Sequence, residues 1–486
     1  MPMREHRTFL AVAAAVVVLA LVAVAGWNFR DDSADKQPAA ALDRTYVSEP
    51  ELTAPVIEVS TYDVEGAPRT GQDDLFFLAP KDGESRTSPL IVDAKGEPVW
   101  IGPDERAYDL RVQEYEGEPV LTWWRGVSPQ PTYGTGEFVI VDQSYEEIAT
   151  VTTQGIMKAD YHELTLTDDG TALMIGRRLE RRDLTAKNGP RRGWIADNIV
   201  QEVDVETGEV LFEWSSLEHI PISEAQVGLR AYGEGTRAAP FDYSHLNSVT
   251  EEPDGSLLIS ARNTNAVYRV DRETGKVDWR LNGNDSDFTM VGDSEFAWQH
   301  DAQRQPDGTI TLFDNEASPP RAKRSRGLRL ALDLKTMTAR VVTEYLPSGR
   351  RLANSQGNMQ VRSNGNVVIG WGEDPYFSEY TADGELILDA DFGTGESYRT
   401  YRLPWHAQPS TKPALVVDSG TAYVSWNGAT DVAAWRFLAG ADAQSARDLG
   451  TVRREGFETS AEVPNAPYVA AQALDADRRV IRTVVS

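Results

Sequence analysis

The strongest constraint on the fold is a short pattern that the chain repeats. In each of four segments a marked residue opens a β-like run, an Asp-Gly or Asn-Gly pair follows, and an apolar run comes next. The segments begin at Tyr161-His162-Glu163-Leu164, Ser244-His245-Leu246-Asn247, Gln299-His300-Asp301-Ala302 and Gln356-Gly357-Asn358-Met359. Because Asx-Gly pairs supply the positive φ angles of tight hairpins, each segment predicts a β-hairpin. Repetition of one such unit predicts an architecture of similar sheets.

A second repeated element follows the hairpins. Glu-Thr-Gly-Glu-Val lies before Trp214, Glu-Thr-Gly-Lys-Val lies before Trp279, and residues 96–100 and 383–387 are similar. These elements predict the outer pair of strands in a four-stranded blade. Units of roughly 40–60 residues with four strands each are typical of a β-propeller. We therefore predict an all-β fold with a six-bladed β-propeller over residues 71–409; a β-sandwich or a solenoid with accidental turn similarity is the alternative.

The last part of the chain, residues 410–486, lacks this repeat. Residues 414–427, 435–438, 456–461 and 468–474 read as strands. The pattern predicts a small C-terminal β-sandwich-like region, similar to a fibronectin type III module. An extra blade or a closing strand is the alternative.

The N-terminus carries a localisation signal. Arg4, His6 and Arg7 precede an apolar run from Phe9 to Gly26, and acidic residues follow it. A run of this length spans a bilayer, and the order of charges places the rest of the chain outside the cytoplasm. Residues 1–30 are predicted as a membrane anchor, or as a cleaved signal whose Ala23-Val24-Ala25 fits the cleavage pattern. Residues 31–70 are predicted as a linker or stalk.

Charge and cysteine content exclude several functions. The formal net charge is −27, and the chain has no cysteine. Nucleic acids and anionic lipid surfaces require a basic face, so binding to either by charge is not expected. Disulfides, thiolate nucleophiles and thiolate metal sites are excluded.

The repeat places chemistry-bearing side chains at equivalent positions. His162, His245 and His300 occupy one position in three segments, and Gly357 occupies it in the fourth. In a propeller the first strand of each blade lines the central channel, so the three imidazoles are expected to meet there. Arg262 ends the strand after the His245 hairpin, and its guanidinium could bind a tetrahedral oxyanion bidentately. Structural histidines and a salt bridge at the edge of a blade are the alternatives.

Three imidazoles and a guanidinium suit transfer of a sulfuryl or phosphoryl group through a histidine intermediate. Cationic donors would neutralise the oxygens as charge develops. Glu163 and Asp301 neighbour two of the histidines but are expected to point away from the channel axis, because side chains alternate along a strand. Asn315 and Asn358 are candidate substrate-binding residues near the axis. His219 and His406 lie off the repeat position and are expected to be structural or surface residues.

Several stretches resemble one family in order and spacing. They are residues 241–249 (FDYSHLNSV), 259–262 (ISAR), 268–279 (YRVDRETGKVDW), 296–301 (FAWQHD) and 312–315 (LFDN). Together they resemble the arylsulfotransferases, in the actinobacterial and fungal branch, over roughly residues 70–480. The resemblance implies a six-bladed propeller that moves sulfate from an aromatic sulfate donor to a phenolic acceptor by a ping-pong route, with no cofactor and no metal.

The resemblance also implies roles. His300, in the Gln-His motif, would be the nucleophile that forms a sulfohistidine; His245 matches the family's HxNS motif, Arg262 matches its arginine, and His162 is the remaining channel histidine. The chain lacks the cysteines and the large N-terminal β-domain of enterobacterial members, so the oligomeric state stays open. Two other functions stay open: a non-enzymatic cell-surface propeller that binds a glycan or protein partner, and a metal site built from the three histidines.

Overall fold

The computed structural model describes residues 43–67, 74–83, 87–130 and 132–486, all within one compact unit. Nearly all regular structure is β, which confirms the all-β prediction. The described helices are single turns: α1 (Ser216–His219), η1 (Thr185–Lys187), η2 (Ile222–Glu224) and η3 (Arg262–Thr264). None of these helices could cross a membrane. The predicted anchor, residues 1–30, lies outside the described residues.

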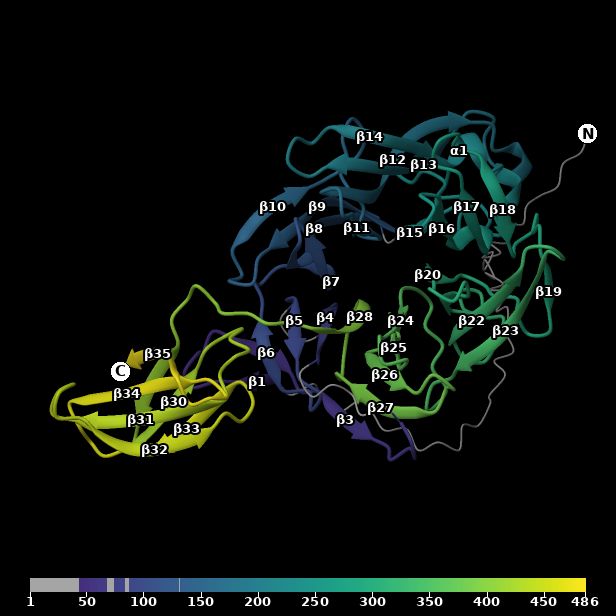
Figure 1. Ribbon diagram of the computed structural model, residues 1–486. Coiled ribbons are helices and arrows are strands. Elements are labelled where there is room, and N and C mark those ends of the chain that lie inside the picture. Colours follow the sequence, from purple (N-terminus) through teal and green to yellow (C-terminus); the bar gives the residue numbers. More distant parts are fainter. Residues whose placement is uncertain (1–42, 68–73, 84–86, 131) are drawn as a thin grey trace, which may run out of the picture. The chain divides into compact units, whose positions relative to one another are not determined.

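Six sheets of four or five strands, antiparallel except for one short strand, make up most of the described chain (Figure 1). The first three sheets are β7 (Ala107–Tyr115), β8 (Glu118–Gln130), β9 (Tyr133–Val141), β10 (Glu147–Val151); β11 (Leu164–Leu166), β12 (Thr171–Arg182), β13 (Gly193–Asp204), β14 (Val210–Ser215); and β15 (Leu246–Glu251), β16 (Leu257–Ala261), β17 (Ala266–Val270), β18 (Val277–Leu281).

The other three sheets contain strands that are distant in sequence. One joins β20 (His300–Arg304), β21 (Ile310–Asp314), β22 (Arg326–Asp333), β23 (Thr338–Tyr345) and the short parallel strand β19 (Thr289–Val291). The next joins β24 (Asn358–Val361), β25 (Val367–Gly370), β26 (Tyr376–Tyr380), β27 (Leu386–Asp391) and β3 (Glu58–Thr61). The last joins β28 (Glu396–Pro404) to β4 (Asp74–Lys81), β5 (Leu90–Val92) and β6 (Pro98–Ile101).

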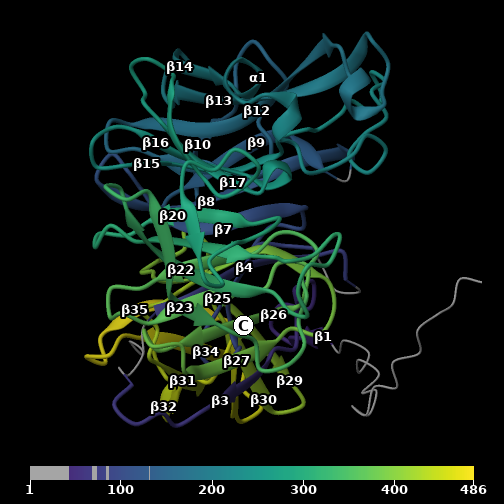
Figure 2. The same cartoon turned by 90° about the vertical axis from the view of Figure 1, so that its right-hand side faces the viewer.

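The six sheets contact one another in a cyclic order. Contacts run from β4 to β7, from β7 to β11, from β12 to β15, from β15 to β20, from β20 to β24, and from β24 back to β28. Since β28 pairs with β4 in one sheet, a late and an early strand close the cycle. Figure 2 shows the sheets from a second direction.

The repeated Asx-Gly pairs form the turns after the first strand of four sheets. Only the glycine of each pair has a positive φ, as in Gly170 (74°) and Gly255 (83°). The Gly170 N–H donates to the Thr167 carbonyl at 3.1 Å, so a type I turn precedes a left-handed glycine. The hairpins are therefore three-residue loops rather than two-residue turns, and the Asx residue keeps ordinary backbone angles.

The hydrophobic core lies between neighbouring sheets. Leu173 and Val200 of one sheet pack in one buried cluster with Val249 and Tyr268 of the next. The β-branched and aromatic residues of each strand thus face the adjacent sheet. This packing fixes the angle between sheets and the position of each first strand.

Two segments add to the six sheets. The C-terminal strands form two antiparallel sheets that share one core: β29 (Ala414–Asp418), β30 (Thr421–Ser425), β33 (Glu458–Glu462), and β31 (Ala434–Gly440), β32 (Arg447–Arg453), β34 (Tyr468–Leu474), β35 (Val480–Val485). Asn427 joins this segment to β6 by hydrogen bonds of 2.8 Å with the N–H and carbonyl of Ile101. Within the predicted linker, β1 (Asp43–Thr45) and β2 (Thr53–Pro55) form a hairpin, and β3 extends a sheet. This part of the linker is folded because Ala54 and Ile57 are buried.

Candidate active site

One cavity of about 590 Å³ brings together the four side chains that the sequence singles out. His162, His245, Arg262 and His300 all line it. Two other cavities are of similar volume, about 610 Å³, so the lining and not the size distinguishes this one. Three imidazoles and a guanidinium around one space are suited to an anionic group. They can donate hydrogen bonds to it, and the guanidinium can neutralise its charge.

His162 is held by an aspartate two residues earlier. The Asp160 carboxylate accepts the Nδ1–H of His162 at 2.8 Å, and the Tyr161 ring stacks on the imidazole with centroids 4.3 Å apart. Asp160 is itself fixed by the N–H groups of Gly134 (2.9 Å) and Tyr161 (2.8 Å). The other ring nitrogen of His162, Nε2, is available to a ligand in the cavity that His162 lines.

His245 repeats this arrangement with a different spacing. Its Nδ1 donates to the Asp242 carboxylate at 2.6 Å, and its backbone is left-handed with φ of 51°. The rings of His245 and His162 are 4.8 Å apart and almost perpendicular. Burial lowers the pKa of His245 to about 4, although Asp242 acts in the opposite direction. At neutral pH His245 is therefore uncharged, with Nε2 as a hydrogen-bond acceptor.

His300 has a neutral partner instead of a carboxylate. Its Nδ1 is 2.7 Å from Oδ1 of Asn315, and its Nε2 accepts the backbone N–H of Gln356 at 3.2 Å. The Asn315 amide donates to the carbonyls of Ala353 (3.1 Å) and Gln356 (3.0 Å), which fixes its oxygen toward His300. Since a backbone N–H can only donate, Nε2 carries the lone pair.

The charge state of His300 agrees with this tautomer. Burial, and after it the charge of Arg262, lowers the pKa of His300 well below its ordinary value, while Asn315 acts to raise it. A neutral imidazole with a lone pair on a cavity-lining nitrogen is a competent nucleophile.

Arg262 is buried without a carboxylate. Its guanidinium donates to Tyr232 Oη, to Asn263 Oδ1 at 3.0 Å and to the Asn354 carbonyl at 3.0 Å. The rings of Tyr232 and Trp298 lie 5.2 and 5.3 Å from it. Within the described part of the chain no carboxylate lies at ion-pair distance, and burial lowers the pKa of Arg262. A buried cation without a counter-charge favours an anionic ligand.

The fourth repeat position cannot hold a side chain. Gly357 has φ of 99°, and a Cβ there would lie 2.5 Å from the Phe313 ring. Glycine is thus required at the place where the other segments carry histidine.

The two asparagines predicted to bind substrate do not line the cavity. Asn315 orients His300 from behind. Asn358 exchanges two hydrogen bonds of 2.9 Å with the backbone of Thr400, which joins β24 to β28. Both Asn358 amide atoms are used there, so its position in the repeat serves sheet closure. His219 stacks on Trp214 at 5.0 Å, and His406 is exposed.

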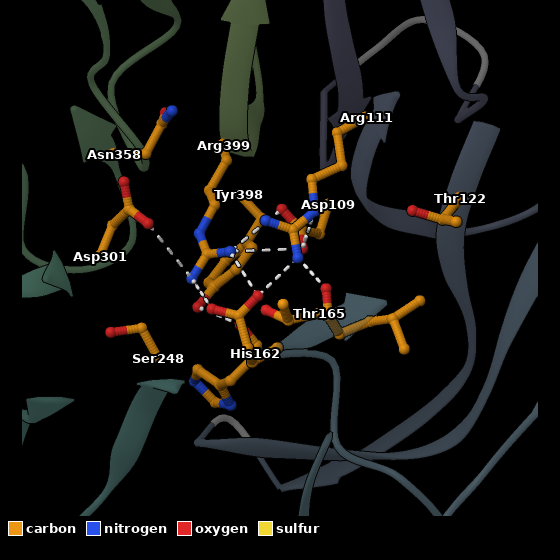
Figure 3. A network of polar contacts seen from close by, with 12 residues as sticks. Asp109, Arg111, Thr122, His162, Thr165, Ser248, Asp301, Asn358, Tyr398 and Arg399 are labelled. Carbon is orange, nitrogen blue, oxygen red and sulfur yellow. Dashed lines mark hydrogen bonds and ion pairs between the residues drawn. The ribbon is translucent and has the colours of Figure 1, made fainter. Parts of the chain in front are cut away.

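Glu163 and Asp301 were predicted to point away from the channel axis. Instead, both face Arg399. Glu163 pairs with Arg399 of β28 at 3.0 Å and with Arg111 of β7 at 2.6 Å, and Asp301 lies 3.8 Å from Arg399 (Figure 3). Strand alternation fails at Asp301 because a bulge follows His300 and because Asp301 has φ of 55°, and it does not apply to Glu163, which precedes β11. These residues form a network of charges that does not line the cavity.

Three residues behind the histidines were missed by the sequence analysis. Arg177, fully buried on β12, bridges Asp160 and Asp242, with 3.3 Å to Asp242. Burial raises the pKa of each carboxyl, but Arg177 and the partner histidine outweigh it and hold both pKa values below the usual range. The available signal was an aspartate two or three residues before each of two channel histidines.

Aromatic rings line the rest of the cavity. Tyr108, Tyr161 and Tyr232 contribute to the wall, and Tyr108 stacks on Tyr161 with centroids 4.3 Å apart. Such rings can stack on an aryl group. Among the described residues no set of three or more histidine and acidic side chains has the geometry to hold a metal ion.

A sequence model of the arylsulfotransferase (ASST) family matches residues 111–393, which is more than half of the chain and includes all four cavity residues. The chain therefore belongs to the arylsulfotransferase family, and this membership supports a sulfotransferase-like function. No curated protein matches the chain.

Similar solved structures are distant. A protein of unknown function from Bacteroides caccae has 12% identity and a TM-score of 0.42, over 68% of this chain and 99% of that one. A catalytically inactive virginiamycin B lyase from Staphylococcus aureus with quinupristin has 9% identity and a TM-score of 0.35, over 76% and 97%. These likenesses are too weak to support a conclusion about fold or activity.

Proposed function

We propose that the protein transfers a sulfuryl group from an aryl sulfate to a phenol through a sulfohistidine at His300. The observation that carries the proposal is the unprotonated Nε2 of His300 beside Arg262, a buried cation without a carboxylate, in one cavity. Family membership supports the reaction class, and the cavity's tyrosines supply a surface for the aryl group.

In the first half-reaction, Nε2 of His300 forms a bond to sulfur as the bond from sulfur to the aryl oxygen breaks. The electron pair of that bond leaves with the phenolate oxygen. Arg262 donates hydrogen bonds to the sulfuryl oxygens and neutralises their charge. The phenolate is protonated by way of the His162 and His245 pair, with the proton supplied from solvent, and it leaves the cavity as phenol.

The second half-reaction reverses these steps. The same pair of histidines accepts the proton of an incoming phenol, and the phenol oxygen attacks sulfur. The nitrogen–sulfur bond breaks, and His300 regains its lone pair. No external cofactor is needed, because the donor and the acceptor differ only in their aryl groups.

The proposal includes the finer features of fold and location. The six sheets in cyclic contact are proposed as blades of a propeller, with first strands around a central channel and a sandwich-like C-terminal region. The sequence motifs favour the actinobacterial and fungal branch of the family. The charge order around Phe9 to Gly26 supports an N-terminal membrane anchor and an extracytoplasmic catalytic domain.

The test uses 4-nitrophenyl sulfate as donor and a panel of phenols as acceptors. Purified protein is expected to release nitrophenol only when an acceptor is present, and His300→Ala is expected to abolish the release. His406→Ala is the matched control, because His406 is exposed and outside the cavity, and it should retain full activity. Mass spectrometry after donor alone should find one sulfuryl group on the peptide that contains His300. Absence of turnover with every acceptor would contradict the proposal.

A further inference from the structure

The two carboxylate-bound histidines share one buried cation. Asp160 holds His162, Asp242 holds His245, and Arg177 contacts both carboxylates. Each of these side chains is nearly inaccessible to solvent. The imidazoles are 4.8 Å apart, so a charge on one raises the cost of a charge on the other. The shared bridge and the short ring distance therefore couple the two imidazoles electrostatically.

Charged and titratable groups surround the pair, and Asp82, Arg106, Tyr108 and Glu396 line the same cavity. The groups that face the pair are Tyr161 and Tyr398 beside His162, Tyr232 beside His245, Tyr133 beside Arg177, Asn198 on Asp242, and Arg262 and His300 in the cavity wall. Burial raises the pKa of Tyr133, Tyr161 and Tyr398, so these three phenols are neutral at neutral pH.

The fixed charges around the cavity balance in the free protein. Asp160 and Asp242 are negative, Arg177 and Arg262 are positive, and His245 is uncharged. The other charged residues of the lining are in ion pairs, Asp82 with Arg106 and Glu396 with Lys81. An aryl sulfate bound in the cavity would add one negative charge to this set, in the space that His162 and His245 line. Among the described residues neither His162 nor His245 has a hydrogen-bond partner at Nε2, whereas Nε2 of His300 already accepts the Gln356 N–H. The pair is thus the place where a compensating proton can be bound.

We propose that the Asp160–Arg177–Asp242 bridge sets the His162 and His245 pair to take up a single proton when an aryl sulfur oxyanion enters the cavity. If the proposed function is correct, this proton is the one given to the departing phenolate; the pair regains a proton from the incoming phenol and releases it when the sulfated product leaves. Arg177 is a positioning residue: its charge prevents protonation of the pair before substrate arrives, and its two ion pairs orient both aspartates.

The first experiment measures proton uptake without turnover. Phenylmethanesulfonate carries an aryl group and a sulfur oxyanion but has no leaving oxygen. Calorimetric titration at pH 7 in buffers of different ionisation enthalpy is expected to show uptake of about one proton per bound molecule. Binding without proton uptake, or absence of binding, would overturn the proposal.

Two substitutions of opposite sign separate positioning from simple structural support. Arg177→Met removes a positive charge, so the pair is expected to be protonated already in the free protein. Proton uptake on binding should then disappear at pH 7 and occur at higher pH instead. Asp242→Asn removes a negative charge, so uptake is expected to move to lower pH. Shifts in the same direction would overturn the proposal, because general loosening of the site would move both alike.

The controls address folding and specificity. Arg178→Met is the matched control, because Arg178 neighbours Arg177 on β12 but pairs with Glu213 at the surface; uptake should be unchanged. Arg177→Lys retains the charge and should retain uptake if Arg177→Met does not fold. Proton uptake without sulfuryl transfer in the wild type would support this inference and contradict the proposed function. Sulfuryl transfer without proton uptake would support the proposed function and contradict this inference.

Discussion

Two buried arginines of this protein have opposite surroundings. Arg399 of β28 lies at the centre of the six sheets, 3.0 Å from Glu163 and 3.3 Å from Asp109. Arg262 lines the cavity, and within the described residues its guanidinium donates hydrogen bonds to a phenol, an amide oxygen and a carbonyl oxygen but to no carboxylate. Burial alone lowers the pKa of an arginine. It does so for Arg262, whereas the carboxylates raise the pKa of Arg399 well above its ordinary value.

The difference indicates that Arg399 stabilises the fold, whereas the charge of Arg262 is available to a ligand. The Arg399 network joins four sheets, through Asp109 of β7, Glu163 before β11, Asp301 of β20 and its own strand (Figure 3). Each charge in it has a partner in the protein. Among the described residues, Arg262 has no carboxylate partner, and the cavity that it lines with the three histidines can hold an anion. Substitutions should therefore affect stability at one arginine and catalysis at the other.

The largest effect is expected for Arg399→Met. It leaves Asp109 and Glu163 with Arg111 as their remaining cation, and loss of one member of a buried ion pair costs about 3–5 kcal/mol. Denaturant unfolding should show this decrease in the free energy of unfolding, while the folded fraction keeps most of its transferase activity. An unchanged unfolding midpoint would contradict the structural role of this network.

The next effect is expected for Arg262→Met. Loss of a donor to the developing oxyanion should lower kcat/KM by roughly 10²–10³. The unfolding free energy should change by less than about 1 kcal/mol, because the substitution also removes a costly buried charge. Steady-state kinetics and unfolding on the same preparation test both parts. A fall in stability equal to that of Arg399→Met would remove the distinction between the two arginines.

A smaller effect is expected for Asn315→Asp, which gives His300 the kind of partner that His162 and His245 have. A carboxylate beside Nδ1 raises the pKa of His300, so a larger fraction loses the Nε2 lone pair at neutral pH. The acid limb of the pH–rate profile should move upward by about 1–2 pH units. Activity at high pH should approach that of the wild type. An unshifted profile would show that the neutral state of His300 does not depend on its amide partner.

These comparisons also show what the sequence could and could not predict. The hairpin repeat placed His162, His245 and His300 at equivalent positions because each opens a first strand. It could not reveal the charge networks, since Glu163 and Arg399 are 236 residues apart and meet only when the sheets close. It also could not show that Asn358 bonds to Thr400, because a repeat position fixes the backbone and not the partner of the side chain.

The smallest effect is expected for Tyr232→Phe. The Tyr232 hydroxyl accepts a hydrogen bond from Arg262, and the phenyl ring retains the cation–π contact at 5.2 Å. Loss of one hydrogen bond to a charged group costs about 1.5–3 kcal/mol at most, and part of this is recovered when the freed N–H turns to the sulfuryl group. We therefore expect a fall in kcat of only a few fold, with KM for the donor unchanged or lower. A loss as large as that of Arg262→Met would mean that the hydroxyl itself takes part in proton transfer, and the acid and base roles given to the two carboxylate-bound histidines would have to include Tyr232.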